Sequence, residues 1–338
     1  MRALVVGASG FIGLRVVDAL LATGAEVRVT RRKSTPTMLF GKRPIEQVWA
    51  SLDEPRELAT AMRGCDVVIL SGAYYPRYSN HLQHSVDTAV TTIRNALDAA
   101  MTARIRVVYT SSAAVLGAPR FGALADEGDV AAPDPSEGVY PTVKRAMEIE
   151  VDRARAQGLD VVSLLVGGCI GPRDYRLGTT GILFALLRGL LPFRIDGWIN
   201  VLSVDDAAAA HVAAIHAPHP RYCVAGHNVR FDALIADVAT RYGVVGDVPH
   251  VSLAEARELA SRAEGAAEPR RERVPFPREL VDLVAMGKPI SSALGERELT
   301  LRWTDLYETL DATRDWIAGL GASKLAAPPE QTWRNHAS

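Results

Sequence analysis

The stretch Ala3-Leu4-Val5-Val6-Gly7-Ala8-Ser9-Gly10-Phe11-Ile12-Gly13 decides the fold of this chain. Its apolar run is typical of a buried parallel strand, and the residues from Phe11 onward have the spacing of a helix. A glycine-rich turn between strand and helix presents backbone N–H groups and a helix N-terminus to a pyrophosphate. Here the glycines permit a sharp turn, a close approach of the ligand and tight packing of helix on strand. We therefore predict dinucleotide binding, rather than a turn without a ligand, at Gly7, Ser9, Gly10, Phe11, Ile12 and Gly13.

Strands and helices alternate through the first half of the chain. The predicted strands are 3–6, 27–30, 45–49, 66–70, 105–110 and 160–166, and the predicted helices are 11–23, 55–62, 86–100 and 140–157. This alternation predicts an α/β protein with a Rossmann-type, doubly wound parallel sheet over residues 1–166. After about Gly167 the alternation loosens, with strands predicted over 194–202 and 222–225 and helices over 231–242 and 304–320. We predict a smaller, mixed α/β substrate-binding region over 167–325, with short returns to the main sheet, and a flexible tail over 326–338.

The composition excludes several classes of protein. The 338 residues are 48% apolar and carry a formal net charge of −1, so there is no basic excess for nucleic acid. No uncharged apolar run is long enough to span a membrane, and the first strand begins too close to Met1 for a signal peptide. Three cysteines, far apart and odd in number, predict reduced thiols in the cytoplasm. The histidines lack metal-ligand spacing, so we predict no metal. With nucleic acid and membrane excluded, we predict that the partner is a small-molecule substrate.

The end of the second predicted strand indicates which dinucleotide binds. The sequence there is Thr30-Arg31-Arg32-Lys33, whereas an acidic residue would suit the ribose diol of NAD. Guanidinium groups can bind a 2′-phosphate through paired hydrogen bonds. We predict that Arg31 and Arg32 favour NADP(H) over NAD(H); a solvated basic turn is the alternative.

Two further motifs carry acid–base chemistry. Tyr140 and Lys144 lie four residues apart in Tyr140-Pro141-Thr142-Val143-Lys144, so they share a helix face if Tyr140 stands at the helix start. A phenol is a poor acid–base group at neutral pH, and a nearby ammonium would lower its pKa. Ser111 and Ser112 follow the strand predicted over 105–110, at the edge where such sheets bind ligands. Each motif alone could be structural, but their order predicts a catalytic set of Ser112, Tyr140 and Lys144.

With these motifs in place, the chain resembles the extended short-chain dehydrogenase/reductase family, in its NAD(P)-dependent epimerase/dehydratase-like branch. The resemblance runs from Met1 to about Trp316 and includes Asn95 and the run Val204-Asp205-Asp206-Ala207 with Ala210-His211. It implies that Ser112 orients a carbonyl, Tyr140 is the acid/base, and Lys144 binds the cofactor ribose and tunes Tyr140. The other positions that it places at the cofactor are Ser51, Leu52, Ser71, Gly72, Ala73, Thr110, Gly167 and Ile170.

The chain departs from the family pattern in several places, among them the loop after the third predicted strand and the residues after Ser112. Ala50-Ser51-Leu52 stands where the family often has Gly-Asp-Leu, so a carboxylate for the adenine is missing. Ser112 is followed by Ala113-Ala114 rather than by the Asp-Glu pair of sugar-nucleotide 4,6-dehydratases, which disfavours elimination chemistry. The resemblance also implies a homodimer built from the helices predicted over 86–100 and 140–157, although their apolar stripes could equally face the sheet.

The expected function is therefore that of an NADPH-dependent oxidoreductase that reduces a ketone of a small organic substrate, similar to dihydroflavonol-reductase-like members of the family. An NAD-dependent sugar-nucleotide epimerase is one alternative, since it would use the same Ser, Tyr and Lys. A non-catalytic NADP-binding regulator is the other, but such relatives commonly lack the Tyr-x-x-x-Lys pair.

Overall fold

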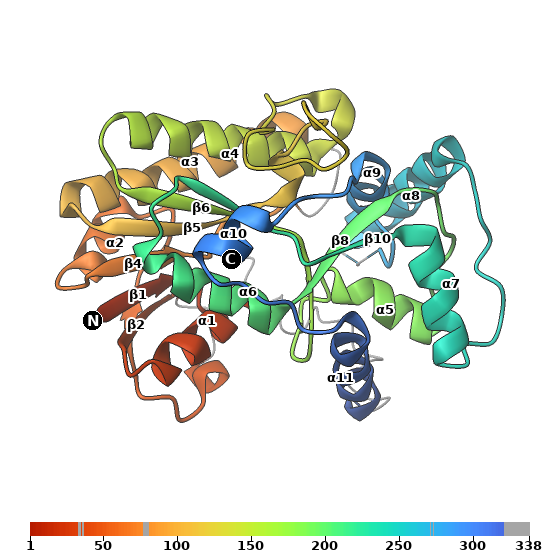
Figure 1. The fold of residues 1–338 in the computed structure, drawn as a ribbon, viewed down its shortest axis with the longest axis horizontal. Helices are drawn as coiled ribbons and strands as arrows, with labels where there is room; N and C mark the ends of the chain where they lie inside the picture. The colour runs from red at the N-terminus through yellow and green to blue at the C-terminus, as the bar shows by residue number, and fades with distance from the viewer. Residues whose placement is uncertain (33–34, 36, 77–80, 271, 273, 321–338) are drawn as a thin grey trace.

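The main sheet of the computed structural model has seven parallel strands in the order β3-β2-β1-β4-β5-β6-β9 (Figure 1). The structure describes residues 1–32, 35, 37–76, 81–270, 272 and 274–320. The strands are β1 (Arg2–Val6), β2 (Glu26–Arg31), β3 (Ile45–Trp49), β4 (Val67–Leu70), β5 (Arg106–Ser112), β6 (Val161–Val166) and β9 (Arg221–Val224). Because β1 pairs with β2 on one side and β4 on the other, the strand order reverses at β1. Open α/β sheets bind ligands beside such a reversal, at the carboxyl ends of the strands.

Helices cover both faces of this sheet (Figure 1). One face packs against α1 (Phe11–Ala22) and α6 (Val204–Ala213). The opposite face packs against α2 (Pro55–Met62), α3 (Leu82–Ala103) and α4 (Val139–Ala156). Successive side chains of a strand point to opposite faces, so Ala3 and Val5 enter the first core while Leu4 and Val6 enter the second. The sheet is doubly wound, which confirms the predicted fold class.

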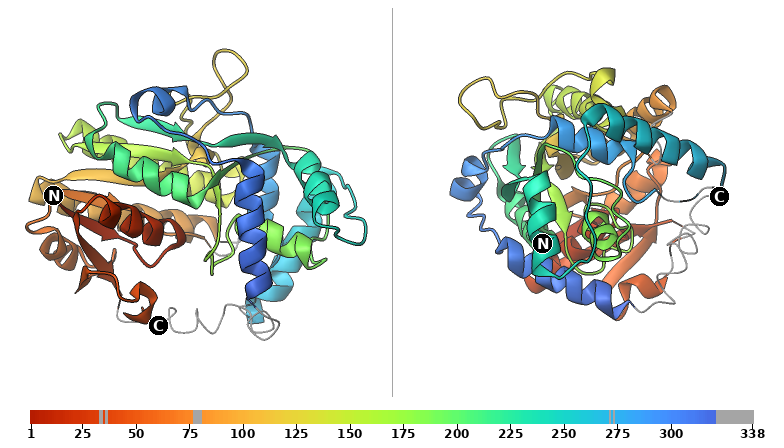
Figure 2. Two further views of the ribbon diagram at one scale, coloured as in Figure 1. Left: turned by 60° about the horizontal axis from the view of Figure 1, so that its bottom comes forward. Right: turned by 90° about the vertical axis from the view of Figure 1, so that its right-hand side faces the viewer.

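A smaller sheet, in the order β10-β8-β7, lies beyond the carboxyl ends of the main strands. Its strands are β7 (Gly168–Ile170), β8 (Trp198–Ser203) and β10 (His227–Arg230), and β8 pairs parallel to β7 but antiparallel to β10. Its helices, shown from two further sides in Figure 2, are α5 (Thr180–Leu187), α7 (Phe231–Arg241), α8 (Leu253–Ala267), α9 (Arg278–Met286) and α11 (Leu306–Gly319), whereas α10 (Ala293–Glu298) packs against β9 of the main sheet. A separate apolar core, which includes Phe193, Phe231 and Phe276, holds the region together.

The predicted boundary at residue 166 falls between β6 and β7, while β9 and α6 return to the main sheet. The strand predicted over 194–202 is shorter, because it begins at Trp198. The predicted tail over 326–338 and Lys33, which follows Arg32, lie outside the described residues. Among the helices that the structure describes, none combines the length and the apolar character that crossing a bilayer requires.

The apolar stripes of α3 and α4 face the sheet. Ile93 and Leu97 of α3 and Val143, Met147 and Val151 of α4 are buried in the core beneath these helices. The outward face at this point carries charges, since Arg94 donates to Glu150 of α4 at 2.6 and 2.9 Å. The stripes therefore give no support to a dimer interface, and the homodimer stays a prediction.

Candidate functional site

A cavity of about 850 Å³ lies between the carboxyl ends of the main strands and the smaller region. Its wall contains most of the residues that the sequence predicts, although they come from separate segments spread over the first half of the chain. These predicted residues are Gly7, Ser9, Gly10, Phe11, Ile12, Arg31, Arg32, Ser51, Leu52, Ser71, Gly72, Ala73, Thr110, Ser112, Tyr140, Lys144 and Gly167. The predicted cofactor positions and the predicted catalytic set thus line one space.

Two predicted cofactor residues do not line this cavity. Gly13 lies one turn into α1, where a Cβ would stand 2.3 Å from the carbonyl oxygen of Gly7. Its absence of a side chain serves the packing of helix on turn. Ile170 lies in the apolar core of the smaller region, because the pairing of β7 with β8 turns its side chain into that core. From that loop, Gly167, Gly168 and Cys169 face the cavity instead.

The turn after β1 forms a cradle that only glycine can make. Gly7 has φ +86°, and a Cβ there would stand 2.3 Å from the backbone nitrogen of Gly72. Gly10 donates its N–H to the Gly7 carbonyl at 2.9 Å and begins α1 without a side-chain cap. The first N–H groups of α1 therefore meet the cavity, where a helix N-terminus favours negative charge. This arrangement fits the pyrophosphate of a dinucleotide.

The ends of β2 and β3 form the adjoining part of the wall. The Arg31 guanidinium lies 3.6 Å from the centroid of the Trp49 ring, and Arg32 is exposed. Asn95 of α3 donates to the Leu52 carbonyl at 3.0 Å, which fixes the loop after β3. Although position 51 carries no carboxylate, an acidic side chain lies two residues further along this loop. Asp53 lines the cavity and accepts a hydrogen bond from the Ser51 hydroxyl at 3.0 Å.

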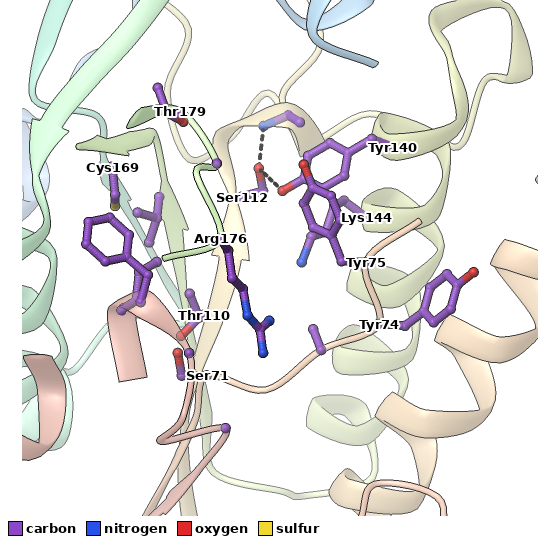
Figure 3. Close-up of a pocket in the computed structure, with 18 of the residues that line it drawn as sticks. Ser71, Tyr74, Tyr75, Thr110, Ser112, Tyr140, Lys144, Cys169, Arg176 and Thr179 are labelled. Carbon is purple, nitrogen blue, oxygen red and sulfur yellow. Dashed lines mark hydrogen bonds between the residues drawn. The ribbon is translucent and has the colours of Figure 1, made fainter. Parts of the chain in front are cut away.

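Ser112 and Tyr140 meet at the carboxyl end of β5 (Figure 3). Tyr140 Oη donates to Ser112 Oγ at 3.3 Å, and Ser112 Oγ also accepts from the Ala114 N–H at 3.2 Å. Both serines belong to β5 rather than following it, because the pairing with β6 continues to Ser112. Because successive side chains of a strand point to opposite faces, the two serines have different partners. Ser111 donates to Glu148 of α4 at 2.7 Å. Ser112 is the serine that reaches Tyr140.

Tyr140 and Lys144 stand in the first two turns of α4. The helix begins at Val139, so Pro141 lies in the first turn, where its missing N–H has no helical acceptor to lose. Gly138 before it has φ +107°, in the region that favours glycine. Lys144 Nζ is 5.7 Å from the Tyr140 ring centroid, and only 6% of Lys144 is exposed. The helix therefore presents both groups to one wall, as the spacing predicted.

The electrostatics of this pair differ from the sequence-based expectation. Burial raises the pKa of Tyr140 above its ordinary value, and the hydrogen bond to Ser112 opposes that shift only in part. Burial also lowers the pKa of Lys144 to about 8, against the attraction of Glu148 and Glu279. A lowered pKa of Tyr140 was expected from the nearby ammonium, but burial dominates, and Glu279 and Cys169 raise the pKa of Tyr140 further. Tyr140 consequently holds its proton at neutral pH.

An aromatic residue that follows β4 covers Tyr140. The ring centroids of Tyr75 and Tyr140 are 5.2 Å apart, and Tyr75 donates from its hydroxyl to Glu279 of α9. This contact links the main sheet to the smaller region across the cavity. The Tyr74 hydroxyl lies 3.3 Å from the Ser85 hydroxyl of α3. Nothing in the sequence indicates this contact between Tyr75 and Glu279.

A buried histidine positions Thr110, a cavity residue at the end of β5. His211 Nδ1 lies 2.7 Å from the Ala207 carbonyl, and its Nε2 lies 2.6 Å from Thr110 Oγ1. Burial lowers the pKa of His211 to about 4, so the ring is neutral. Because a carbonyl only accepts, Nδ1 donates and Nε2 accepts from the Thr110 hydroxyl. Thr110 then offers an acceptor oxygen to the cavity.

Fold and cavity together define a dinucleotide-binding protein with a Ser-Tyr-Lys set beside the nucleotide cradle. Residues 3–226 match the model of the NAD dependent epimerase/dehydratase family, and the chain belongs to this family. The family binds an NAD(P) cofactor, and the chain is an NAD(P)-dependent enzyme of the oxidoreductase type, as predicted. Within the described residues, no group of three or more His, Cys, Asp or Glu side chains could hold a metal ion.

Relatives of known name share much of the chain. A putative dihydroflavonol 4-reductase from Synechocystis is 27% identical over 328 residues, which is 95% of each chain. The sterol demethylase protein B of Methylococcus capsulatus is 27% identical over 68% of this chain and 70% of its own length. Among solved structures, a nucleoside-diphosphate-sugar epimerase from Pseudomonas aeruginosa has a TM-score of 0.80 at 24% identity, over 95% of this chain and 98% of its own. The structural similarity supports the fold.

Proposed function

We propose that the protein reduces a ketone of a small apolar substrate to a secondary alcohol with NADPH. The hydrogen bond of 3.3 Å between Tyr140 Oη and Ser112 Oγ carries the proposal. This hydrogen bond brings two hydroxyl groups together at the wall of the cavity that the nucleotide cradle also lines. The reductase name of a relative that matches along 95% of the chain agrees with it.

The cofactor would lie along the cradle of Gly7, Ser9 and Gly10, with its adenosine end toward Arg31 and Arg32. When bound, it supplies the hydride that a ketone needs. Lys144 would donate to the hydroxyl groups of the cofactor ribose, because its ammonium is compact and faces the same wall as Tyr140. The acceptor oxygen of Thr110 lies on the neighbouring part of the wall.

The catalytic set would handle the substrate oxygen. Ser112 donates a hydrogen bond to the carbonyl oxygen and orients it, and Tyr140 donates the proton that this oxygen takes up as it becomes an alcohol. Burial raises the pKa of Tyr140, so the phenol carries the required proton at neutral pH. The Lys144 ammonium then stabilises the phenolate that the transfer leaves. This proton balance suits the direction of reduction.

The far end of the cavity supports an apolar substrate. The apolar side chains that line it come mainly from α9 and β8 and include Ile199, Leu280, Leu283, Val284, Met286 and Ile290, while Asn200, Glu279 and Lys288 line the same part of the cavity. Such a surface favours a hydrocarbon body around the ketone. The sugar-nucleotide epimerase remains the alternative because the same Ser, Tyr and Lys would serve it. Its substrate would place a sugar and a diphosphate against this surface.

Assays of ketone reduction and of cofactor binding test this proposal. We expect the purified protein to oxidise NADPH when given aryl or long-chain alkyl ketones, and to bind NADPH more tightly than NADH. Two charge-assisted hydrogen bonds to the 2′-phosphate correspond to about tenfold or more in affinity. Isothermal titration gives the two dissociation constants, and loss of NADPH absorbance gives the rates. Interconversion of UDP-sugars with NAD that copurifies, without turnover of ketones, would establish the epimerase instead.

The charge of Lys144 gives a pH dependence. A bound dinucleotide favours the ammonium, whereas the free site releases the proton at a pKa of about 8. Affinity for NADPH is therefore highest below that pH and falls as the pH rises through it. We expect a loss of about tenfold between about pH 6.5 and about pH 9.5, measured by fluorescence titration. Lys144→Met should bind more weakly with a flat profile, and an equally sloped profile in this variant would assign the titration to another group.

A further inference from the structure

Arg176 projects into the cavity from the loop between β7 and α5 (Figure 3). Its guanidinium lies between Ser71, which follows β4, and the wall that carries Tyr75 and Lys144. The side chain is open to solvent in the cavity, although protein atoms surround it on most sides. Neither the glycine-rich turn nor the catalytic set accounts for a cation at this place.

The surroundings of Arg176 indicate an anion. Burial lowers the pKa of its guanidinium, the charge of Arg32 lowers it further, and Asp174 opposes both effects. Arg176 and the exposed Arg32 line the same cavity, and their positive charges repel each other there. A phosphate between them would turn this repulsion into attraction, with up to two hydrogen bonds from each planar donor group.

The loop is built to hold Arg176 in this direction. Arg173 and Leu177 on either side have φ of +69° and +49°, a conformation that costs energy without glycine. Asp174, only 1% exposed, accepts from the Gly178 N–H at 2.8 Å, while Leu177 is buried. At the loop's start, Arg15 of α1 donates to the Pro172 carbonyl at 3.3 Å. The loop is therefore tied to the same helix whose N-terminus forms the cradle.

We propose that Arg176 binds a phosphate group of the dinucleotide together with Arg32. The assignment rests on the proposed NADPH cofactor and adds a contact that comes from beyond β6. The Arg176 side chain is directed toward Ser71 and Thr110 in Figure 3, on the side of the cavity that also carries the nucleotide cradle. A phosphate of the cofactor, rather than an anionic group of the substrate, is the ligand that this position favours.

The test compares dissociation constants for NADPH and NADH in the whole protein, measured by calorimetry without substrate. We expect Arg176→Gln to weaken NADPH by about tenfold or more, as the loss of a charge-assisted contact implies. Arg173→Gln is the matched control, because Arg173 lies in the same loop, is exposed and does not line the cavity. It should leave both constants unchanged. Arg176→Lys keeps the charge and should recover part of the affinity.

The pattern across variants separates the possible phosphates. A loss limited to NADPH places Arg176 at the 2′-phosphate, and non-additive losses in the double variant with Arg32→Gln then show that both residues share it. Equal losses for NADPH and NADH, with the same non-additive losses in the double variant, place both residues at the pyrophosphate, which also supports the proposal. Unchanged binding in Arg176→Gln, or an equal loss in Arg173→Gln, overturns it while NADPH binding by the native protein still supports the function. Failure of the native protein to bind either dinucleotide would overturn both.

Discussion

Tyr140→Phe is expected to lower the turnover of an apolar ketone by about 10²–10⁴, the usual contribution of a positioned acid or base. The substitution removes one oxygen atom and leaves the ring against Tyr75. The substrate oxygen then has no proton donor beyond the Ser112 hydroxyl, whose proton is far less acidic. NADPH affinity and the unfolding temperature should stay close to those of the native protein. Single-turnover kinetics at saturating NADPH would measure the chemical step separately from product release.

A second tyrosine provides the matched control. Tyr109 lies on β5 three residues before Ser112, fully buried, with its hydroxyl 3.9 Å from the Met147 sulfur. Tyr109→Phe makes the same chemical change outside the cavity and should retain turnover. Ser112→Ala should lose turnover as well, because it removes the partner of the Tyr140 hydroxyl. Near-native turnover in Tyr140→Phe would mean that another group donates the proton, and the proposed catalytic set would be wrong.

The parts of the fold that the sequence predicts well are those fixed by short-range chemistry. Gly7, Gly10 and Gly13 could be assigned to a turn between strand and helix because a backbone with positive φ and close approaches leaves few other residues possible. The four-residue spacing of Tyr140 and Lys144 likewise determines a shared helix face. Alternation of strands and helices then implies a parallel sheet, which brings Ser112 to the same edge as the cradle. The position of these residues on the wall of one cavity follows from that topology.

Features that depend on tertiary surroundings could not be predicted in this way. Arg176 and Glu279 reach the cavity from loop and helix positions that carry no recognisable motif. The pKa of Tyr140 was predicted with the wrong direction, because the sequence shows a nearby ammonium but not how deeply both groups are buried. Ile170 was placed at the cofactor from its position in a loop, whereas pairing of β7 with β8 turns its side chain into the apolar core.

Gly7→Ala should damage both stability and cofactor binding. Position 7 has φ +86°, which costs about 1–2 kcal/mol for a residue with a Cβ. That Cβ would also stand 2.3 Å from the Gly72 nitrogen, and overpacking of this kind costs about 1–3 kcal/mol more. Because relief of the clash moves the cradle away from β4, we also expect NADPH affinity to fall by more than about tenfold. Urea unfolding and calorimetric titration measure the two effects.

Gly24→Ala separates the steric clash from the backbone cost. Gly24 follows α1 with φ +78°, close to that of Gly7, but nothing lies within 4 Å of its Cβ position. Alanine there should cost only the backbone term of about 1–2 kcal/mol and should leave NADPH binding intact. The difference between the two variants then measures the close approach of the β1 and β4 turns. If both lost the same stability and Gly7→Ala still bound NADPH normally, the turn would tolerate a side chain, and its glycine would serve chain reversal rather than the cofactor.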